Sequence, residues 1–96
     1  MDKSYFVYIL TNDRHELYIG ITNDLVRRLW EHGTGQDSQS YSHRHGTTRL
    51  VYYEMTTDVR SAIQREKQLK RYPRQKKLLL IESMNPEWRD LATTSF

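Results

Sequence analysis

Three polar side chains recur at an interval of ten residues, in segments that otherwise have the composition of buried structure. They are Tyr8, Tyr18 and Arg28. Arginine suits a phosphate because its planar guanidinium donates hydrogen bonds in pairs and stays charged at physiological pH. A tyrosine hydroxyl can donate or accept a proton at such a group. Each residue alone is more often structural, but together they form the hypothesis of a phosphate site.

Two strands joined by a short turn would hold the tyrosines. Residues 5–11 are β-branched and aromatic with apolar side chains on both faces, which is typical of a central strand. Residues 17–22 would pair with them as a hairpin, with Ile19 on the core face and Tyr18 and Gly20 on the other. Gly20 indicates either a bulge or a close approach by a ligand.

A helix predicted after the second strand would carry Arg28. Residues 22–24 can cap it, and glycines near positions 33 to 35 can end it. Arg28 and His32 are four residues apart and share one helical face. Arg27 lies about 100° further round the helix, so we expect Arg28 to face the sheet and Arg27 to face solvent.

The remaining chain predicts one more strand and two more helices. The polar segment 36–48 is a predicted loop, 49–55 a strand, and Thr57 or Asp58 and then Pro73 begin helices, the last ending near Ser83. We therefore expect an α/β (α+β) fold of order ββαβαα. Its three-stranded, mainly antiparallel sheet would have strand order 2-1-3 and helices on both faces. Trp88 would anchor a C-terminal turn before a frayed end from Thr93.

Composition favours one domain over residues 1–96, with its core at about 4–91. The chain has 96 residues, 36% of them hydrophobic, and no cysteine, which excludes disulfides and thiolate metal sites. We see no signal peptide, and the longest apolar run, residues 78–81, is too short to cross a membrane. We expect a soluble cytoplasmic protein and favour a monomer.

The net charge of +3 conceals a concentrated basic segment. Between Arg60 and Lys77 there are eight cations and one acid, Glu66. Such a segment favours a polyanionic partner, because phosphates that are neutralised release counterions. A solvated helix face is the alternative.

Glu66 continues an apolar stripe of the second helix, made by Val59, Ala62, Ile63 and Leu69. An ionised carboxylate that faces a core is costly unless it is paired or bound to a metal. Glu66 therefore forms a salt bridge to an arginine, lies at the margin of the stripe, or binds a metal beside a phosphate site.

These segments together resemble the GIY-YIG nuclease superfamily, and most of all its small stand-alone bacterial proteins. The resemblance runs from Tyr5 to about Leu91 and rests on Phe6-Val7-Tyr8, on Tyr18-Ile19-Gly20 with the residues up to Leu29, on His32 and on Glu66. It implies a catalytic set whose members are Tyr8, Tyr18, Arg28, His32 and Glu66.

The resemblance also implies a role for each of these residues. One tyrosine would deprotonate or position the attacking water, and Arg28 would steady the scissile phosphate. His32 would act as an acid or base or contact the phosphate. Glu66 would hold one divalent metal ion, Mg²⁺ or Mn²⁺, whose other ligands are waters and phosphate oxygens.

Two positions depart from the family pattern, and two histidines stay unassigned. Phe6 replaces a motif glycine, and Ile21 stands where many relatives carry a lysine near the phosphate, which puts turnover in question. His43 and His45 lack the partners of a zinc site, so we expect DNA contact or a simple loop there.

The leading hypothesis is a metal-dependent endonuclease that hydrolyses DNA phosphodiester bonds. It would select branched, nicked or single-stranded structures rather than a base sequence. Its nucleic-acid contacts would be Arg27, Arg65, Lys67, Lys70, Arg71 and Arg74. The alternative is a non-catalytic DNA- or RNA-binding module. A third class, a protein-interaction adaptor, would use an aromatic surface at Tyr52, Tyr53 and Trp88.

Overall fold

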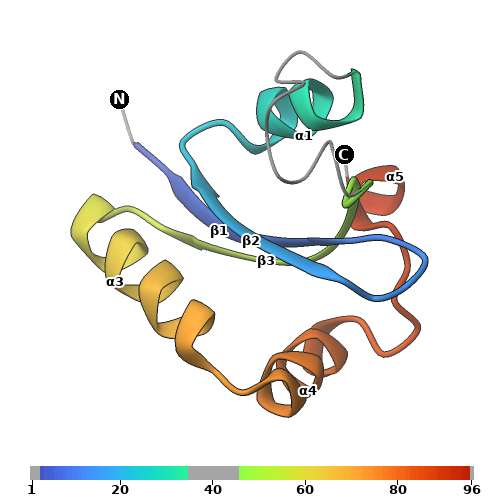
Figure 1. The fold of residues 1–96 in the computed structure, drawn as a ribbon. Coiled ribbons are helices and arrows are strands. Elements are labelled where there is room, and N and C mark those ends of the chain that lie inside the picture. Colours follow the sequence, from blue (N-terminus) through green and yellow to red (C-terminus); the bar gives the residue numbers. More distant parts are fainter. Residues whose placement is uncertain (1–2, 35–45, 96) are drawn as a thin grey trace.

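The sheet has the predicted strands and the predicted order. A computed structural model describes residues 3–34 and 46–95 (Figure 1). Strand β1 (Tyr5–Thr11) lies between β2 (Leu17–Thr22) and β3 (Arg49–Thr56), and both pairings are antiparallel. Residues 7–11 of β1 are buried, as expected for a central strand with apolar side chains on both faces.

Helices cover both faces of the sheet. Helices α1 (Leu25–Thr34) and α5 (Leu91–Ser95) lie on one side, and α3 (Val59–Arg71) and α4 (Arg74–Met84) lie on the other (Figure 1). The expected frayed end is wrong for residues 93–95, which belong to α5. The Asp90 carboxylate explains this helix, because it accepts hydrogen bonds from the backbone N–H of both Ala92 and Leu50.

The alternation of side chains along each strand produces two separate cores. We call them the α1 core and the α3 core, after the helix that covers each. The α1 core contains Tyr8, Leu10, Leu25 and Leu50. The α3 core contains Val7, Ile9, Ile19, Val51, Tyr52, Ala62, Leu69 and Ile81. Neighbouring residues of β1 therefore belong to different cores. On β3, Val51 and Tyr52 share the α3 core, because the register shifts opposite Ile9 and Leu10.

The helix boundaries follow the predicted caps closely. Asp24 accepts a hydrogen bond from the Arg27 N–H at 3.2 Å and caps α1. Asp58, rather than Thr57, caps α3 by accepting from the N–H groups of Arg60 and Ser61. Pro73 lies just before α4 rather than in its first turn.

Trp88 anchors the C-terminal segment, as predicted. Its indole stacks on the His15 ring with centroids 4.2 Å apart, and Arg74 donates to the His15 carbonyl at 2.8 Å. The aromatic surface of the adaptor alternative is not available as a whole, because Tyr52 is 6% exposed within the α3 core and Trp88 stacks on His15. No described helix is long and apolar enough to cross a bilayer.

Candidate active site

Four of the five predicted catalytic residues meet on the α1 side of the sheet. The Tyr8 hydroxyl lies 3.2 Å from Nε2 of His32. The Tyr18 ring centroid is 6.2 Å from that of Tyr8 and 5.3 Å from that of His32. The guanidinium of Arg28 lies close enough to both tyrosine side chains for each of them to raise its pKa. We call these four residues the tyrosine–arginine group.

Gly20 is the residue that lets the two tyrosines approach each other. It pairs directly with Tyr8 in a regular β1–β2 register, so no bulge exists there. A Cβ at this position would lie 2.5 Å from the Tyr8 hydroxyl oxygen and 3.0 Å from a ring carbon of Tyr18. The glycine makes room for Tyr8, not for an approaching ligand.

The group opens to solvent on the side of Arg28. Tyr8 and His32 are each 1% exposed, whereas Tyr18 is half-buried. The side chain of Arg28 is 28% exposed and that of Arg27 is 74% exposed, which confirms the predicted orientations. A hollow of about 180 Å³ beside Arg28 is lined by residues of the β2–α1 turn and of α1.

Burial and neighbouring groups set the protonation of Tyr8 and of Arg28. Burial raises the pKa of Tyr8 well above its ordinary value, and Tyr18 adds to the rise while Arg28 opposes it. Tyr8 is therefore neutral at physiological pH. Burial works against the charge of Arg28, but hydrogen bonds to Tyr8 and then Glu31 raise its pKa overall, so it stays a cation.

Glu31 also belongs to this site, although it was not among the residues predicted from the sequence. Its Oε1 lies 3.2 Å from Nη1 of Arg28, and its Oε2 lies 3.4 Å from Nε of Arg27. The sequence does contain the pattern that predicts these contacts. Glu31 follows Arg28 by three residues and Arg27 by four, so it lies on the same side of the helix. Glu31 therefore helps to hold the Arg28 side chain in place.

Glu66 stands apart from the tyrosine–arginine group. It lies on α3, across the sheet, with a side chain 17% exposed and 3.7 Å from the ammonium of Lys70. The predicted partner was an arginine, so that detail is wrong. The apolar stripe is also incomplete, because Ala62 and Leu69 are buried while Val59 and Ile63 are exposed. Glu66 therefore lies at the margin of the stripe.

Arg65 shows which way Glu66 points. Its Nε donates to Oε1 of Glu54 at 2.7 Å, so this side of α3 faces β3. Consecutive residues of a helix are about 100° apart. Leu69 faces the sheet, and Arg65 and Glu66 lie on opposite sides of it around the helix. Because Arg65 is on the β3 side and β2 is the opposite edge of the sheet, Glu66 is on the side of α3 that faces the β2 edge.

The donor set at Glu66 suits a hard cation. Among the described residues no three His, Cys, Asp or Glu side chains gather into a metal-binding cluster. The Glu66 carboxylate is itself partly exposed. Mg²⁺ accepts such a site because it keeps most of its waters and prefers oxygen ligands.

Ile21 does not interrupt the tyrosine–arginine group. It pairs with Val7 and packs against the α3 core, so its side chain lies on the opposite face from Tyr18 and Gly20. A lysine at this position would extend on the α3 side of the β2 edge. The departure from the family pattern thus leaves the α1 side unchanged.

Among the predicted nucleic-acid cations, Arg65 is half-buried and the others are exposed. Arg65 is engaged, since it donates to Glu54, to Gln68 at 2.8 Å and to Tyr72 at 3.3 Å. The hydrogen bond to Glu54 is the main cause of its raised pKa. The remaining predicted cations are exposed; they are Arg27, Lys67, Lys70, Arg71 and Arg74. His43 and His45 lie outside the described residues.

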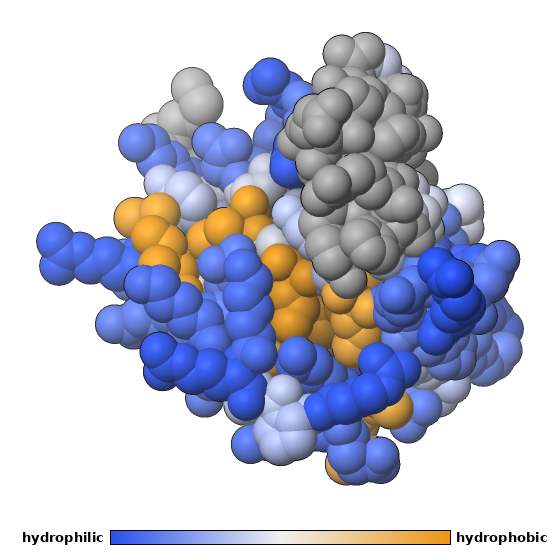
Figure 2. Space-filling model, in the orientation of Figure 1, coloured by the Kyte–Doolittle hydropathy of each residue, from blue (hydrophilic) through white to orange (hydrophobic). Residues whose placement is uncertain are grey.

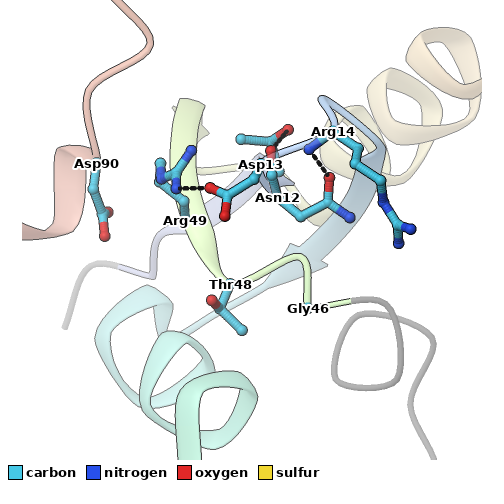
Figure 3. Close-up of a pocket in the computed structure, with 8 residues that line it drawn as sticks. Asn12, Asp13, Arg14, Gly46, Thr48, Arg49 and Asp90 are labelled. Atoms are coloured by element: carbon cyan, nitrogen blue, oxygen red, sulfur yellow. Dashed lines mark hydrogen bonds and ion pairs between the residues drawn. The ribbon is translucent and has the colours of Figure 1, made fainter.

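A larger hollow, of about 550 Å³, lies at the end of the sheet formed by the β1–β2 turn (Figure 3). Its polar groups bond to one another: Arg49 donates to Asp13 at 2.7 Å, and the Arg14 N–H donates to the Asn12 side chain at 3.0 Å. The Asn12 amide also donates to Glu16 at 2.7 Å. These bonds account for the turn, so the hollow is a structural feature.

Comparisons with known proteins agree with the geometry. A family model described as the GIY-YIG catalytic domain matches residues 4–78. A UPF0213 protein of Oceanobacillus iheyensis is 37% identical over 91% of this chain and 100% of its own length. One of Syntrophus aciditrophicus is 38% identical over 91% and 98%. The solution structure of a UPF0213 protein from Bacillus halodurans has a TM-score of 0.60 and 27% identity, and the match covers 96% of this chain and 97% of that one.

Proposed function

Because this chain belongs to the GIY-YIG catalytic-domain family, a nuclease-type family, we propose that it is a metal-dependent endonuclease that hydrolyses DNA phosphodiester bonds. The observation that supports this best is the convergence of Tyr8, Tyr18, Arg28 and His32 beside an opening. A structural role alone does not call for four polar side chains at one point of a buried sheet face.

Each residue of the group has a distinct part in this proposal. Arg28 binds the scissile phosphate and stabilises the negative charge that develops on it. Tyr18, the more exposed tyrosine, positions the attacking water. Tyr8 keeps its proton because of its burial, and its hydroxyl, 3.2 Å from Nε2, orients the His32 ring as an acid or base or a phosphate contact.

Glu66 would hold the divalent metal, Mg²⁺ or Mn²⁺, at the β2 edge. When bound, such an ion supplies Lewis-acid stabilisation of phosphate oxygens. The edge of β2 separates Arg28 on the α1 side from Glu66 on the α3 side, so we place the cleaved phosphate across this edge. Lys70 balances the charge of Glu66 until the ion binds.

We further propose that the enzyme selects DNA structure rather than base sequence. The exposed cations can contact backbone phosphates, which carry no sequence information. Branched, nicked and single-stranded DNA bring flexible phosphates to a single edge strand more readily than an intact duplex does. RNA with the same backbone geometry is the other candidate substrate.

The test is a cleavage panel of branched, nicked, single-stranded and duplex DNA, and matched RNA, with Mg²⁺ or Mn²⁺. Glu66→Gln keeps the shape of the side chain but removes its charge, and it should abolish cleavage while binding in EDTA persists. Substantial cleavage by this variant would refute the metal assignment. Binding without cleavage by the unaltered protein, across all metals and substrates, would favour a non-catalytic binding module.

A further inference from the structure

A stripe of exposed polar residues runs along α3 on the side that faces away from the sheet. The helix contacts the α3 core through Ala62 and Leu69. About half a turn away, exposed residues follow at intervals of four, three and four: Arg60, Gln64, Lys67 and Arg71. Figure 2 shows hydrophilic side chains over the region of α3 and α4, below an apolar band. We call these four residues the outer stripe.

The carboxylates near α3 do not neutralise the outer stripe. Glu66 pairs with Lys70, and Glu54 pairs with Arg65, and neither of these cations belongs to the stripe. Asp58 accepts backbone hydrogen bonds at the start of the helix. The stripe therefore keeps three positive charges on an exposed helix surface, which is an electrostatic match for a polyanion.

A hollow beside the stripe has the composition of a nucleotide site. It measures about 360 Å³ and is lined by Gln64, Lys67, Gln68, Arg71 and Tyr72. The amides can bond to a base edge and the two cations to a phosphate. Arg65 donates to Oε1 of Gln68 at 2.8 Å, which leaves the Gln68 NH₂ group as a donor.

The outer stripe and the tyrosine–arginine group lie on opposite sides of the sheet. Arg28 belongs to the α1 layer, whereas the stripe is on the far side of the α3 layer (Figure 1). A straight segment of nucleic acid lies against one side of a body this small, whose extents are 37 × 31 × 26 Å. A substrate that contacts both must bend sharply or supply two segments.

We propose that the outer stripe binds a second segment of DNA, separate from the segment that is cleaved. This inference rests on the proposed function and deepens it, because it assigns the substrate to DNA that presents two backbone segments, such as a junction. Lys67 and Arg71 contact phosphates of the second segment, and Gln64 and Gln68 contact a base within the hollow.

The test compares two double variants that lose the same charge. Lys67→Gln with Arg71→Gln removes two stripe cations, and Arg14→Gln with Arg89→Gln removes two exposed cations from other segments. Binding of a four-way DNA junction and of a linear duplex of equal length is measured by fluorescence anisotropy in EDTA, over a series of salt concentrations.

The stripe variant should bind the junction more weakly, with a log–log salt slope shallower by about 2, because about one counterion is released per phosphate contact. The control variant should keep the slope of the unaltered protein. Identical slopes for the two variants, in a protein that still cleaves DNA, would overturn this inference and leave the proposed function intact. Failure of the unaltered protein to bind or cleave any DNA would overturn both.

Discussion

Both faces of the sheet are buried, but the side chains that fill the two cores differ in chemistry. On the α3 side, the largest fully buried side chains are aliphatic, such as Ile9, Leu69 and Ile81. On the α1 side, Tyr8 and His32 are just as buried and carry polar atoms that need partners. Apolar side chains need only close packing, whereas buried polar groups also need hydrogen-bond partners. On the α1 side, the fold therefore buries polar groups that could serve catalysis, although such groups are costly to bury.

The largest loss of stability is expected when a buried aliphatic side chain is removed from the α3 core. Leu69→Ala leaves a cavity beneath α3, and we expect the free energy of unfolding to fall by about 2 to 5 kcal/mol. Urea unfolding measures this loss. Leu79→Ala is the matched control, because Leu79 on α4 is 58% exposed, and it should change stability by less than about 0.5 kcal/mol. Equal losses would contradict the assignment of the core.

On the α1 side, the loss of a single hydroxyl oxygen should lower the stability of the protein. Tyr8→Phe keeps the ring but leaves Nε2 of His32 buried without its hydroxyl partner, so unfolding should become easier by about 1 to 3 kcal/mol. The comparison is Tyr18→Phe, where partial exposure lets water replace the hydroxyl and the loss should be smaller. A Tyr8→Phe protein as stable as the unaltered one would show that this contact is not structural.

A smaller loss of stability is expected at alkaline pH, and it arises from Tyr52 in the α3 core. Burial, and then a hydrogen bond with the Glu54 carboxylate, raise the pKa of Tyr52 to about 12. The unfolded chain loses this proton near pH 10, so stability is complete below about pH 10 and falls as pH rises towards 12. Urea unfolding between about pH 9 and pH 11 should show the fall, and Tyr52→Phe should make it shallower. An unchanged slope in that variant would contradict the assignment.

Local patterns predicted most of the frame. Alternation along β2 placed Ile19 and Tyr18 on opposite faces, and helical spacing placed Arg28 inward and Arg27 outward. These features depend on periods of two and of about 3.6 residues, which neighbouring residues alone determine.

Features that depend on distant partners could not be predicted in the same way. From the sequence, Arg65 is a candidate phosphate-binding cation, but in the structure it donates a hydrogen bond to Glu54 on β3. Helix α5 forms because Asp90 also bonds to Leu50, forty residues away. The role of Gly20 likewise depends on where the Tyr8 ring lies across the strand pair.

The central claim is that the tyrosine–arginine group, and not cationic charge in general, cleaves DNA. Arg27 and Arg28 are adjacent on α1 and differ in direction, so Arg28→Ala and Arg27→Ala form a matched pair. Single-turnover cleavage of junction DNA with Mg²⁺, at saturating protein, should slow by about 10² to 10³-fold for Arg28→Ala. Arg27→Ala should stay within about threefold of the unaltered rate, because a contact to the backbone affects affinity more than the chemical step. Equal rates for the two variants would contradict the account.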